Sequence, residues 1–375
     1  MKIVYLIEWM YNSAGMERVT ANKVNYWADY GHDVLLVTTD QQGRPDYYPL
    51  RPSVRRIDLA VNFEAYQGLP IARRVLAYLK KSSELKKKLR ELLMKERPDV
   101  CVSLMLKSAC VLYRIKDGSR KVIEHHFSHQ YAQQFSDTFN RHGLNRFIYA
   151  LSGRVEAHYI KKYEHFVVLT EEDKRLWGSR FKNICVIPNS LSFMPQSKAA
   201  LQNKVVLAIG RLDYQKGFDL LLDVWNSLQP TPWQLHIYGD GPLKSDLENK
   251  IRTLHLQNVS LYPPTHEIQD VMLESSVFVL SSRFEGFPMA LIEALACGLP
   301  AVSTDCPCGP GEIIRDGRDG YVVPLNDLKA FANRLKALMT DDVLRRQLGS
   351  AAACSVQRFS EAEVMLRWER LFGIS

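Results

Sequence analysis

Apolar residues gather in short runs along the first half of the chain, separated by polar turns and by one helix-like stretch at residues 15–30. Short apolar runs bounded by turns are typical of strands buried on both faces, and strands that alternate with helices form parallel sheets. The pattern therefore predicts an α/β domain. Its expected strands are residues 2–7, 33–39, 99–104, 121–124, 165–169 and 184–187.

The same rhythm begins again after a polar stretch at residues 188–203, which has the composition of a linker. The strands expected in this second half are residues 204–209, 233–238, 277–281, 300–303 and 320–323, with helices at 217–228, 243–254 and 288–296. A last helix is predicted at 361–372. We therefore expect two α/β domains, residues 1–190 and 204–354, with a linker at 191–203 and a helical segment at 355–375.

The composition is that of a soluble globular protein, with 46% hydrophobic and 24% charged residues among 375. The first apolar run ends at Glu8, too early for a secretion signal, and no stretch is long enough for a membrane-spanning helix. The seven cysteines are scattered, and the one close pair, Cys306 and Cys308, has no second pair nearby to complete a zinc site. These features favour free thiols and a cytoplasmic location.

Positive charge is concentrated in the first half, where residues 1–190 carry 31 Lys and Arg against 20 Asp and Glu. Its densest part is Lys80–Arg97, in which leucines recur at roughly helical spacing among lysines. A basic amphipathic helix can bind an anionic membrane surface. It can equally be an ordinary surface helix whose apolar stripe packs on a sheet. The sequence does not decide between these two interpretations of the helix. Nucleic acid is not an expected partner.

The most informative motif, residues 281–294, joins a predicted strand to a predicted helix. Pro288 suits the first helical turn, and the preceding amides of Gly286 and Phe287 can face an anion together with the helix dipole. Glu285 and Glu293 flank this turn eight residues apart. A carboxylate in that position is typical of one that holds ribose hydroxyls, although a cap and a solvated residue are the plainer alternatives.

A second strand-to-helix turn, residues 210–217, carries Arg211 and Lys216 between two glycines. Two cations five residues apart around such a turn can converge on one diphosphate, the role that a metal ion has in other sites. Surface salt bridges are the alternative, but they would not need both cations beside glycines.

Together the two motifs resemble the donor site of family-4 retaining glycosyltransferases of the GT-B fold, whose Glu-x7-Glu signature matches Glu285 and Glu293. The similarity spans nearly the whole chain and includes residues 14–18, 186–189, 238–242 and 316–320. Residues 14–18 are similar to the family's glycine-rich loop, with Ala14 where a first glycine is common. The resemblance implies two Rossmann-like domains whose parallel sheets face each other across a cleft.

The resemblance also implies the roles of individual residues. Arg211 and Lys216 would neutralise the donor diphosphate, Glu293 would hold the ribose, and Glu285 would contact the transferred sugar. His125 would lie near that sugar. His126, the next residue, stays an alternative for the same role. The implied binding residues are Gly15, Gly239, Gly286, Phe287, Leu291 and Glu293, and the final helix would return to the first domain so that hinge closure brings His125 toward Glu285.

The activity implied is retaining transfer of a sugar from a nucleotide-diphosphate donor, UDP- or GDP-linked, to a glycan or lipid-linked acceptor in polysaccharide or glycoconjugate synthesis. No metal and no cofactor are expected, because the chain has no Asp-x-Asp pair. The enzyme would be cytoplasmic, with possible peripheral binding to the inner face of the membrane. A phosphorylase of the same fold and a non-catalytic nucleotide-binding protein are the alternatives. A dinucleotide oxidoreductase is disfavoured, because residues 12–18 lack Gly-x-Gly-x-x-Gly.

Overall fold

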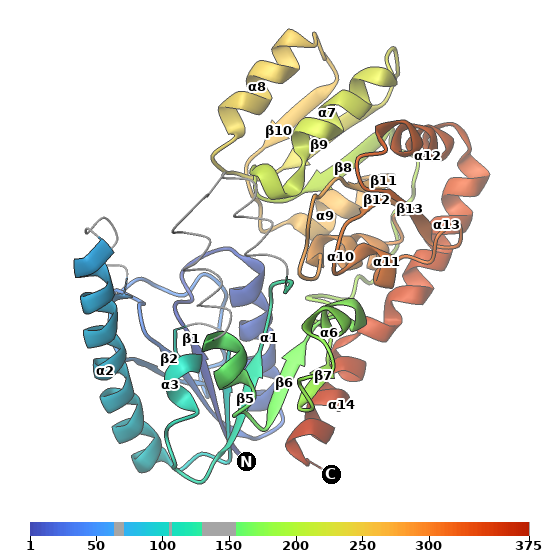
Figure 1. Ribbon diagram of the computed structural model, residues 1–375. Helices are drawn as coiled ribbons and strands as arrows, with labels where there is room; N and C mark the ends of the chain where they lie inside the picture. Colours follow the sequence, from blue (N-terminus) through green and yellow to red (C-terminus); the bar gives the residue numbers. More distant parts are fainter. Residues whose placement is uncertain (64–70, 105–106, 130–154, 375) are drawn as a thin grey trace. The chain divides into compact units, whose positions relative to one another are not determined.

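The computed structural model describes residues 1–63, 71–104, 107–129 and 155–374 (Figure 1). The chain divides into two compact units. The first contains residues 1–169, 173–187 and 368–375, and the second contains residues 170–172 and 188–367. The segment at 191–203 is thus part of the second unit, and of the segment at 355–375 only the last eight residues group with the first.

The first unit is built on a seven-stranded sheet of parallel strands in the order β3-β2-β1-β4-β5-β6-β7. Its strands are β1 (Lys2–Ile7), β2 (Asp33–Thr38), β3 (Arg55–Asp58), β4 (Val100–Ser103), β5 (Arg120–Glu124), β6 (His165–Val168) and β7 (Ile184–Val186). Val4 of β1 lies between Leu35 of β2 and Cys101 of β4 in register. The helices of this unit among the described residues are α1 (Gly15–Asp29), α2 (Ile71–Glu96), α3 (Ala109–Leu112) and α6 (Glu171–Trp177), the last of which begins in the second unit.

The second unit contains a six-stranded parallel sheet in the order β10-β9-β8-β11-β12-β13. Its strands are β8 (Val205–Ile209), β9 (Gln234–Tyr238), β10 (Val259–Tyr262), β11 (Val277–Leu280), β12 (Ala301–Asp305) and β13 (Gly320–Pro324). From β8 the chain builds outward through β9 to β10, then returns to place β11 on the other side of β8. The order of the strands therefore reverses between β8 and β11, which is where ligands bind in open α/β sheets.

The helices of the second unit connect these strands and then follow them. They are α7 (Phe218–Ser227), α8 (Lys244–Thr253), α9 (Ile268–Leu273), α10 (Met289–Ala296), α11 (Pro310–Ile313), α12 (Leu328–Thr340) and α13 (Asp342–Ser355), with short 3-10 turns η2 (Tyr214–Lys216) and η3 (Val356–Phe359). The last helix, α14 (Glu361–Phe372), begins in the second unit and ends in the first. No helix in the described ranges has both the length and the apolar composition needed to cross a membrane.

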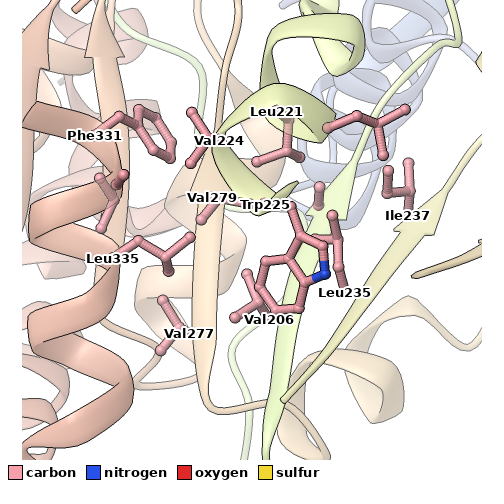
Figure 2. Packing of buried hydrophobic residues seen from close by; sticks show 14 of the residues in the cluster. Val206, Leu221, Val224, Trp225, Leu235, Ile237, Val277, Val279, Phe331 and Leu335 are labelled. Atoms are coloured by element: carbon pink, nitrogen blue, oxygen red, sulfur yellow. The ribbon is translucent and has the colours of Figure 1, made fainter. Parts of the chain in front are cut away.

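The core of the second unit forms where α7 and α12 pack on the sheet (Figure 2). Trp225 of α7 is fully buried there between strand residues such as Val206 and Leu235 and the α12 residue Leu335. Its indole nitrogen donates a hydrogen bond to Asn258 Oδ1 at 3.1 Å, so the ring is both packed and fixed in orientation. Burying a large aromatic ring contributes several kcal/mol to stability, on the order of 3–5 by truncation.

One side of α2 packs on the first sheet and the other is exposed. Leu85, Leu89 and Leu93 are fully buried in the core of the first unit. The apolar residues near its start are exposed, with Leu76 at 70% and Leu79 at 59%. The packing interpretation of the leucine stripe is therefore correct for the second half of the helix.

The end of α14 is anchored in the first unit by aromatic packing. Trp368 and Phe372 are buried, and the Phe372 ring lies 5.3 Å from that of Trp27 in α1. Tyr26 of the same helix donates a hydrogen bond to Glu369 at 2.9 Å. These contacts fix residues 368–374 to the first unit, although the helix begins in the second.

A buried ion pair lies beneath this helix end. The Lys23 ammonium is hydrogen-bonded to Glu124 at the end of β5, and both side chains are at most 1% exposed. The Lys23 ammonium also lies over the Trp368 ring, 4.5 Å from its centre, and His126 approaches Glu124 at 3.2 Å. Burial raises the pKa of Glu124, but the charge of Lys23 and the hydrogen bonds from His126 and Lys23 outweigh it and bring that pKa to about 2.

Candidate donor-binding site

Two loops meet at the point where the strand order of the second sheet reverses. The loop after β8 carries Arg211 and Lys216, and the loop after β11 carries Glu285. Because β8 and β11 are parallel neighbours, their carboxyl ends lie at the same edge of the sheet. The two motifs, about 70 residues apart in sequence, are therefore adjacent in the fold.

Lys216 and Glu285 form the centre of this arrangement. Lys216 Nζ donates a hydrogen bond to Glu285 Oε1 at 2.7 Å, and the Ser282 hydroxyl donates to the same oxygen at 2.6 Å. Glu285 is 4% exposed, whereas the Lys216 side chain is 20% exposed. The aliphatic part of Lys216 runs across Gly210, where an added Cβ would lie 3.0 Å from its carbons. The ammonium is thus positioned at the surface end of a buried carboxylate.

Asp213 connects the two cations of the β8 loop. One of its carboxylate oxygens accepts a hydrogen bond from the Lys216 amide at 3.2 Å, and the other pairs with the Arg211 guanidinium at 2.6 Å. Arg211 is otherwise exposed, at 63%. The structure therefore fixes Lys216 more tightly than Arg211, whose side chain can change partner at little cost because exposed ion pairs contribute only about 0–1 kcal/mol.

Further hydrogen bonds join the β8 and β11 loops. Arg283 donates to both carboxylate oxygens of Asp219 at 2.6 and 2.8 Å, and its guanidinium lies 4.1 Å from the centre of the Tyr214 ring. The Ser281 hydroxyl donates to the Lys216 carbonyl at 2.9 Å. These links tie the β11 loop to the β8 loop and to the start of α7, and catalysis by fixed charges requires such support of the groups that carry them.

Helix α10 begins directly beyond Glu285, with Pro288 as its N-cap residue. The amides of Gly286 and Phe287 precede it and donate no hydrogen bond within the described part of the chain. Glu293, in the second turn, is 2% exposed, and Leu291 is fully buried. The helix start thus offers free amides and the positive end of its dipole, while Leu291 contributes packing.

Gly239, at the end of β9, permits a close approach of two backbone segments. Its amide donates to the Tyr262 carbonyl at 2.9 Å, and an added Cβ would overlap the Gly210 carbonyl oxygen. Gly217 has a left-handed φ of 62°, and a Cβ there would overlap the Ser281 carbonyl oxygen. These glycines keep the loops after β8, β9 and β11 in contact.

We expect Gly239→Ala to destabilise the protein by about 1–3 kcal/mol, the usual cost of an overpacked site. Gly317→Ala is the matched control, because Gly317 has a left-handed φ of 73° but no atom within 4 Å of an added Cβ. That control measures backbone strain alone, about 1 kcal/mol. Thermal or urea unfolding compares them, and equal stability of Gly239→Ala and wild type would contradict the overlap.

His125 lies in the first unit, at the carboxyl end of β5. Its amide donates to the Val167 carbonyl at 2.9 Å, its ring is 8% exposed, and Trp177 packs against it edge-on at 5.4 Å. Nδ1 lies 3.9 Å from Asp173, beyond hydrogen-bond distance. Its neighbour His126 points to Glu124 instead, and burial lowers the pKa of His126, which favours its neutral form. His125 is thus separate from the buried ion pair.

Gly15 is the first residue of α1, after the N-cap residue Ala14, and Glu17 follows in the first turn. Glu17 is 2% exposed, and its Oε1 accepts a hydrogen bond from the Trp9 indole at 3.0 Å. Burial raises the pKa of Glu17 to about 7, against the opposing effect of that hydrogen bond. A titratable group therefore lies beside the Gly15 turn, at a position that the sequence analysis did not select.

The raised pKa of Glu17 predicts a pH-dependent stability. The protonated form fits the folded state, so this contribution is complete below the unfolded pKa near 4.5 and is lost as the pH rises through 7. Glu17→Gln, which stays neutral, should be more stable than wild type at pH 8, by on the order of 2–3 kcal/mol, and similar at pH 5. Urea unfolding at both pH values tests this, with exposed Glu248→Gln as the control. An equal gain at both pH values would contradict it.

No group of three or more His, Cys, Asp or Glu side chains within the described ranges is arranged to hold a metal ion. All seven cysteines are free, and Cys306 and Cys308 are buried. The predicted cations of the donor-site candidate are Lys216 and Arg211.

Comparison with known proteins identifies the family. Residues 13–192 match the model of Glycosyltransferase Family 4, and residues 191–354 match that of Glycosyl transferases group 1. The amylovoran biosynthesis glycosyltransferase AmsD of Erwinia amylovora is 31% identical over 393 residues, covering 99% of this chain and 99% of the relative. The chain belongs to the family-4, group 1 glycosyltransferases. The resemblance seen in the sequence is thereby confirmed.

One further relative and one solved structure are also similar to this chain. A Campylobacter jejuni protein, GalNAc-alpha-(1->4)-GalNAc-alpha-(1->3)-diNAcBac-PP-undecaprenol alpha-1,4-N-acetyl-D-galactosaminyltransferase, is 26% identical over 380 residues, covering 100% of this chain and 98% of its own. The crystal structure of Staphylococcus aureus TarM, solved with fondaparinux, alpha-GlcNAc-glycerol and UDP, matches with a TM-score of 0.79 and 17% identity over 99% of each chain. The fold of this glycosyltransferase is therefore GT-B, as predicted.

Of the predicted site residues, the structure of this glycosyltransferase brings Lys216 and Glu285 into contact and links Arg211 to them through Asp213. Asp213 and the Arg283–Asp219 pair were not among the predicted site residues. Asp213 could have been found, because an Asp that precedes a helical turn and its Lys is a typical cap. The Arg283–Asp219 pair depends on the adjacency of β8 and β11 and has no local signal.

Proposed function

We propose that this glycosyltransferase is a retaining enzyme that transfers a sugar from a UDP-sugar to a lipid-linked glycan acceptor without a metal ion. The observation that carries the proposal is the 2.7 Å contact between Lys216 and Glu285 at the strand-order reversal of the second sheet. It supplies a fixed cation and a buried carboxylate beside the amides that open α10. That combination suits a diphosphate with a sugar attached.

In the proposed reaction the bond between the anomeric carbon and the diphosphate oxygen breaks as negative charge develops on the leaving group. Lys216, the amides of Gly286 and Phe287, and Arg211 released from Asp213 stabilise this charge. The acceptor oxygen bonds to the anomeric carbon on the face that the diphosphate leaves, and its proton passes to a donor phosphate oxygen. Glu285 orients the sugar hydroxyls, Glu293 holds the ribose, and His125 has the role at the sugar that the family resemblance implies.

The donor and acceptor classes are supported by the relatives. TarM was crystallised with UDP, and the Campylobacter jejuni relative is named for an undecaprenol-diphosphate-linked glycan. AmsD is named for the biosynthesis of a polysaccharide. A lipid-linked acceptor in the assembly of a bacterial polysaccharide or glycoconjugate is therefore our proposal for this chain.

Transfer assays with UDP- and GDP-sugars test the proposal, using a short undecaprenyl-diphosphate-linked glycan as acceptor and chelator in every reaction. We expect a UDP-sugar to be consumed and the product to retain the anomeric configuration of the donor, as measured by proton NMR. Inversion of the anomeric centre would contradict the mechanism. Phosphate-dependent release of sugar from a glycoside, without nucleotide, would instead assign a phosphorylase.

We also propose that α2 binds an anionic membrane surface. Its exposed side carries Leu76 and Leu79 together with exposed lysines, among them Lys86 and Lys87. Lys88 has a structural role, because it donates to the Leu59 carbonyl at 2.8 Å and pairs with Glu84. An apolar patch bordered by lysines suits peripheral binding, to which each lysine near the headgroups contributes about 1 kcal/mol.

Lys86→Gln/Lys87→Gln should reduce binding to phosphatidylglycerol vesicles roughly tenfold or more, from the loss of two such contributions. The same double change at Lys244 and Lys336, lysines of the second domain, is the control and should leave vesicle binding unchanged. Sedimentation with vesicles measures both. Equal binding of wild type and the α2 variant would remove the membrane proposal and leave the transferase proposal intact.

A further inference from the structure

A basic hollow in the second unit lies outside the donor-site candidate. Its cavity volume is about 370 Å³, within the range of about 300–1,000 Å³ typical of small-molecule sites. The lining residues come from the segment between α11 and β13, the end of α13, and η3, and none belongs to the donor motifs. They are Arg315, Arg318, Asp319, Ala351, Cys354, Ser355 and Arg358.

The three arginines are held differently. Arg358 donates to the carbonyls of Ser355, Glu312 and Ile313 at 3.2, 3.1 and 2.6 Å, so its guanidinium is fixed. Arg315 and Arg318 are exposed at the rim, and neither forms an ion pair with another described residue. One rigid cation is thus combined with two that are free to close over a ligand.

Two observations indicate that the positive charge of this cluster is only partly balanced. Burial and the neighbouring charge of Arg315 lower the pKa of Arg358, and the charge of Asp319, the one carboxylate of the lining, opposes this without cancelling it. The second half of the chain is acidic overall, so three arginines in one hollow do not follow from its general charge. An anion that enters the hollow would relieve this repulsion.

Asp319 indicates which further group that anion carries. It is 1% exposed, and its Oδ1 accepts a hydrogen bond from the Arg315 amide at 2.7 Å. Its Oδ2 is also buried and has no hydrogen-bond partner within the described ranges. A buried acceptor in a hollow otherwise lined by cations suits a ligand that places a hydroxyl donor beside its anionic group.

We propose that the hollow formed by Arg315, Arg318 and Arg358 binds a phosphate ester that carries a neighbouring hydroxyl group. Guanidinium groups match the paired oxygens of phosphate, and several forks around one group suit its tetrahedral shape better than a single carboxylate. Asp319 Oδ2 accepts the neighbouring hydroxyl. A soluble sugar or glycerol phosphate and a glycerophospholipid headgroup share this chemistry.

Titration calorimetry of the full chain with glycerol 3-phosphate tests the soluble source. Sedimentation with phosphatidylglycerol vesicles tests the lipid source, and every protein in that experiment carries Lys86→Gln/Lys87→Gln so that α2 does not contribute to vesicle binding. Arg315→Gln/Arg318→Gln should weaken binding of the phosphate ester about tenfold or more, because two charge-assisted contacts are lost. Arg346→Gln, an exposed arginine of α13 outside the hollow, is the matched control and should bind as wild type does. Lys216→Met should also bind as wild type, because the donor site is separate from the hollow.

If wild type binds glycerol 3-phosphate and the double variant does not, the ligand of the hollow is a soluble phosphate ester. Binding to vesicles alone, lost in the same variant, would assign a lipid headgroup. The proposal is overturned if wild type binds neither probe, if the double variant binds as wild type does, or if Lys216→Met abolishes the binding. Both replaced arginines are exposed, so the double variant should unfold at the same temperature as wild type. If it unfolds at a lower temperature, the single variant Arg318→Gln is used in its place.

Discussion

Replacing Lys216 with methionine is expected to lower the rate of sugar transfer by about 10²–10³-fold, the cost of removing one preorganised charge donor from a transition state. The reason is the position of the ammonium, 2.7 Å from Glu285 at the carboxyl ends of β8 and β11. Methionine keeps most of the side-chain length that packs across Gly210 but has no charge. The initial rate of UDP release in the presence of acceptor measures the effect.

The control for this substitution is Lys244→Met, which removes an exposed lysine from the start of α8 in the same unit. Its rate should equal that of wild type. Lys216→Met also leaves Glu285 without its cation, so Lys216→Met/Glu285→Gln is measured beside it to remove the uncompensated carboxylate. If the double variant recovers wild-type activity, Lys216 acts only by neutralising Glu285, and its proposed role at the diphosphate is wrong.

The second large effect concerns stability. Lys23→Met should destabilise the protein by about 3–5 kcal/mol, because it leaves Glu124 as a buried and uncompensated charge. Both members of the pair are almost completely buried, and Trp368 of α14 covers the lysine. Urea unfolding monitored by circular dichroism measures the change, and the transition of the first unit should move to lower denaturant concentration.

The double variant Lys23→Met/Glu124→Gln should recover a large part of this loss, because no unpaired buried charge remains. An exposed ion pair gives the comparison. Arg51 pairs with Asp29 at 2.8 Å with both side chains about half exposed, and Arg51→Met should cost at most about 1 kcal/mol. If Lys23→Met costs no more than Arg51→Met, the buried pair does not hold the end of α14 to the first unit as the structure indicates.

Strands in the middle of each sheet could be predicted because burial on both faces produces short apolar runs. β1, β2 and β8 follow the predicted ranges to within one or two residues. β3 and β10 lie at sheet edges. The residues of β3 are mostly exposed and those of β10 are partly buried, so neither sequence has a buried apolar run. Helices α12 and α13 were also not predicted, although Phe331 and Leu335 of α12 are buried at helical spacing.

The sequence shows the candidate residues of the donor site, but it does not show which of them touch. The glycines and cations of residues 210–217 and the two glutamates of 285–293 are visible in the sequence. Their contact is not, because it depends on β11 returning beside β8 rather than continuing past β10. The same topology explains why Arg283 pairs with Asp219. Glu17 was missed for a different reason, because its burial and its hydrogen bond from Trp9 become apparent only in the folded structure.

The central claim is that the donor diphosphate binds at the β8 and β11 loops through Lys216 and without a metal ion. The most direct test is calorimetric titration of the full chain with UDP in buffer containing chelator, for wild type, Lys216→Met and Lys244→Met. We predict one site with the same Kd in chelator and in magnesium, weakened about tenfold or more in Lys216→Met and unchanged in Lys244→Met. Loss of UDP binding in chelator, or equal affinity of wild type and Lys216→Met, would contradict the claim.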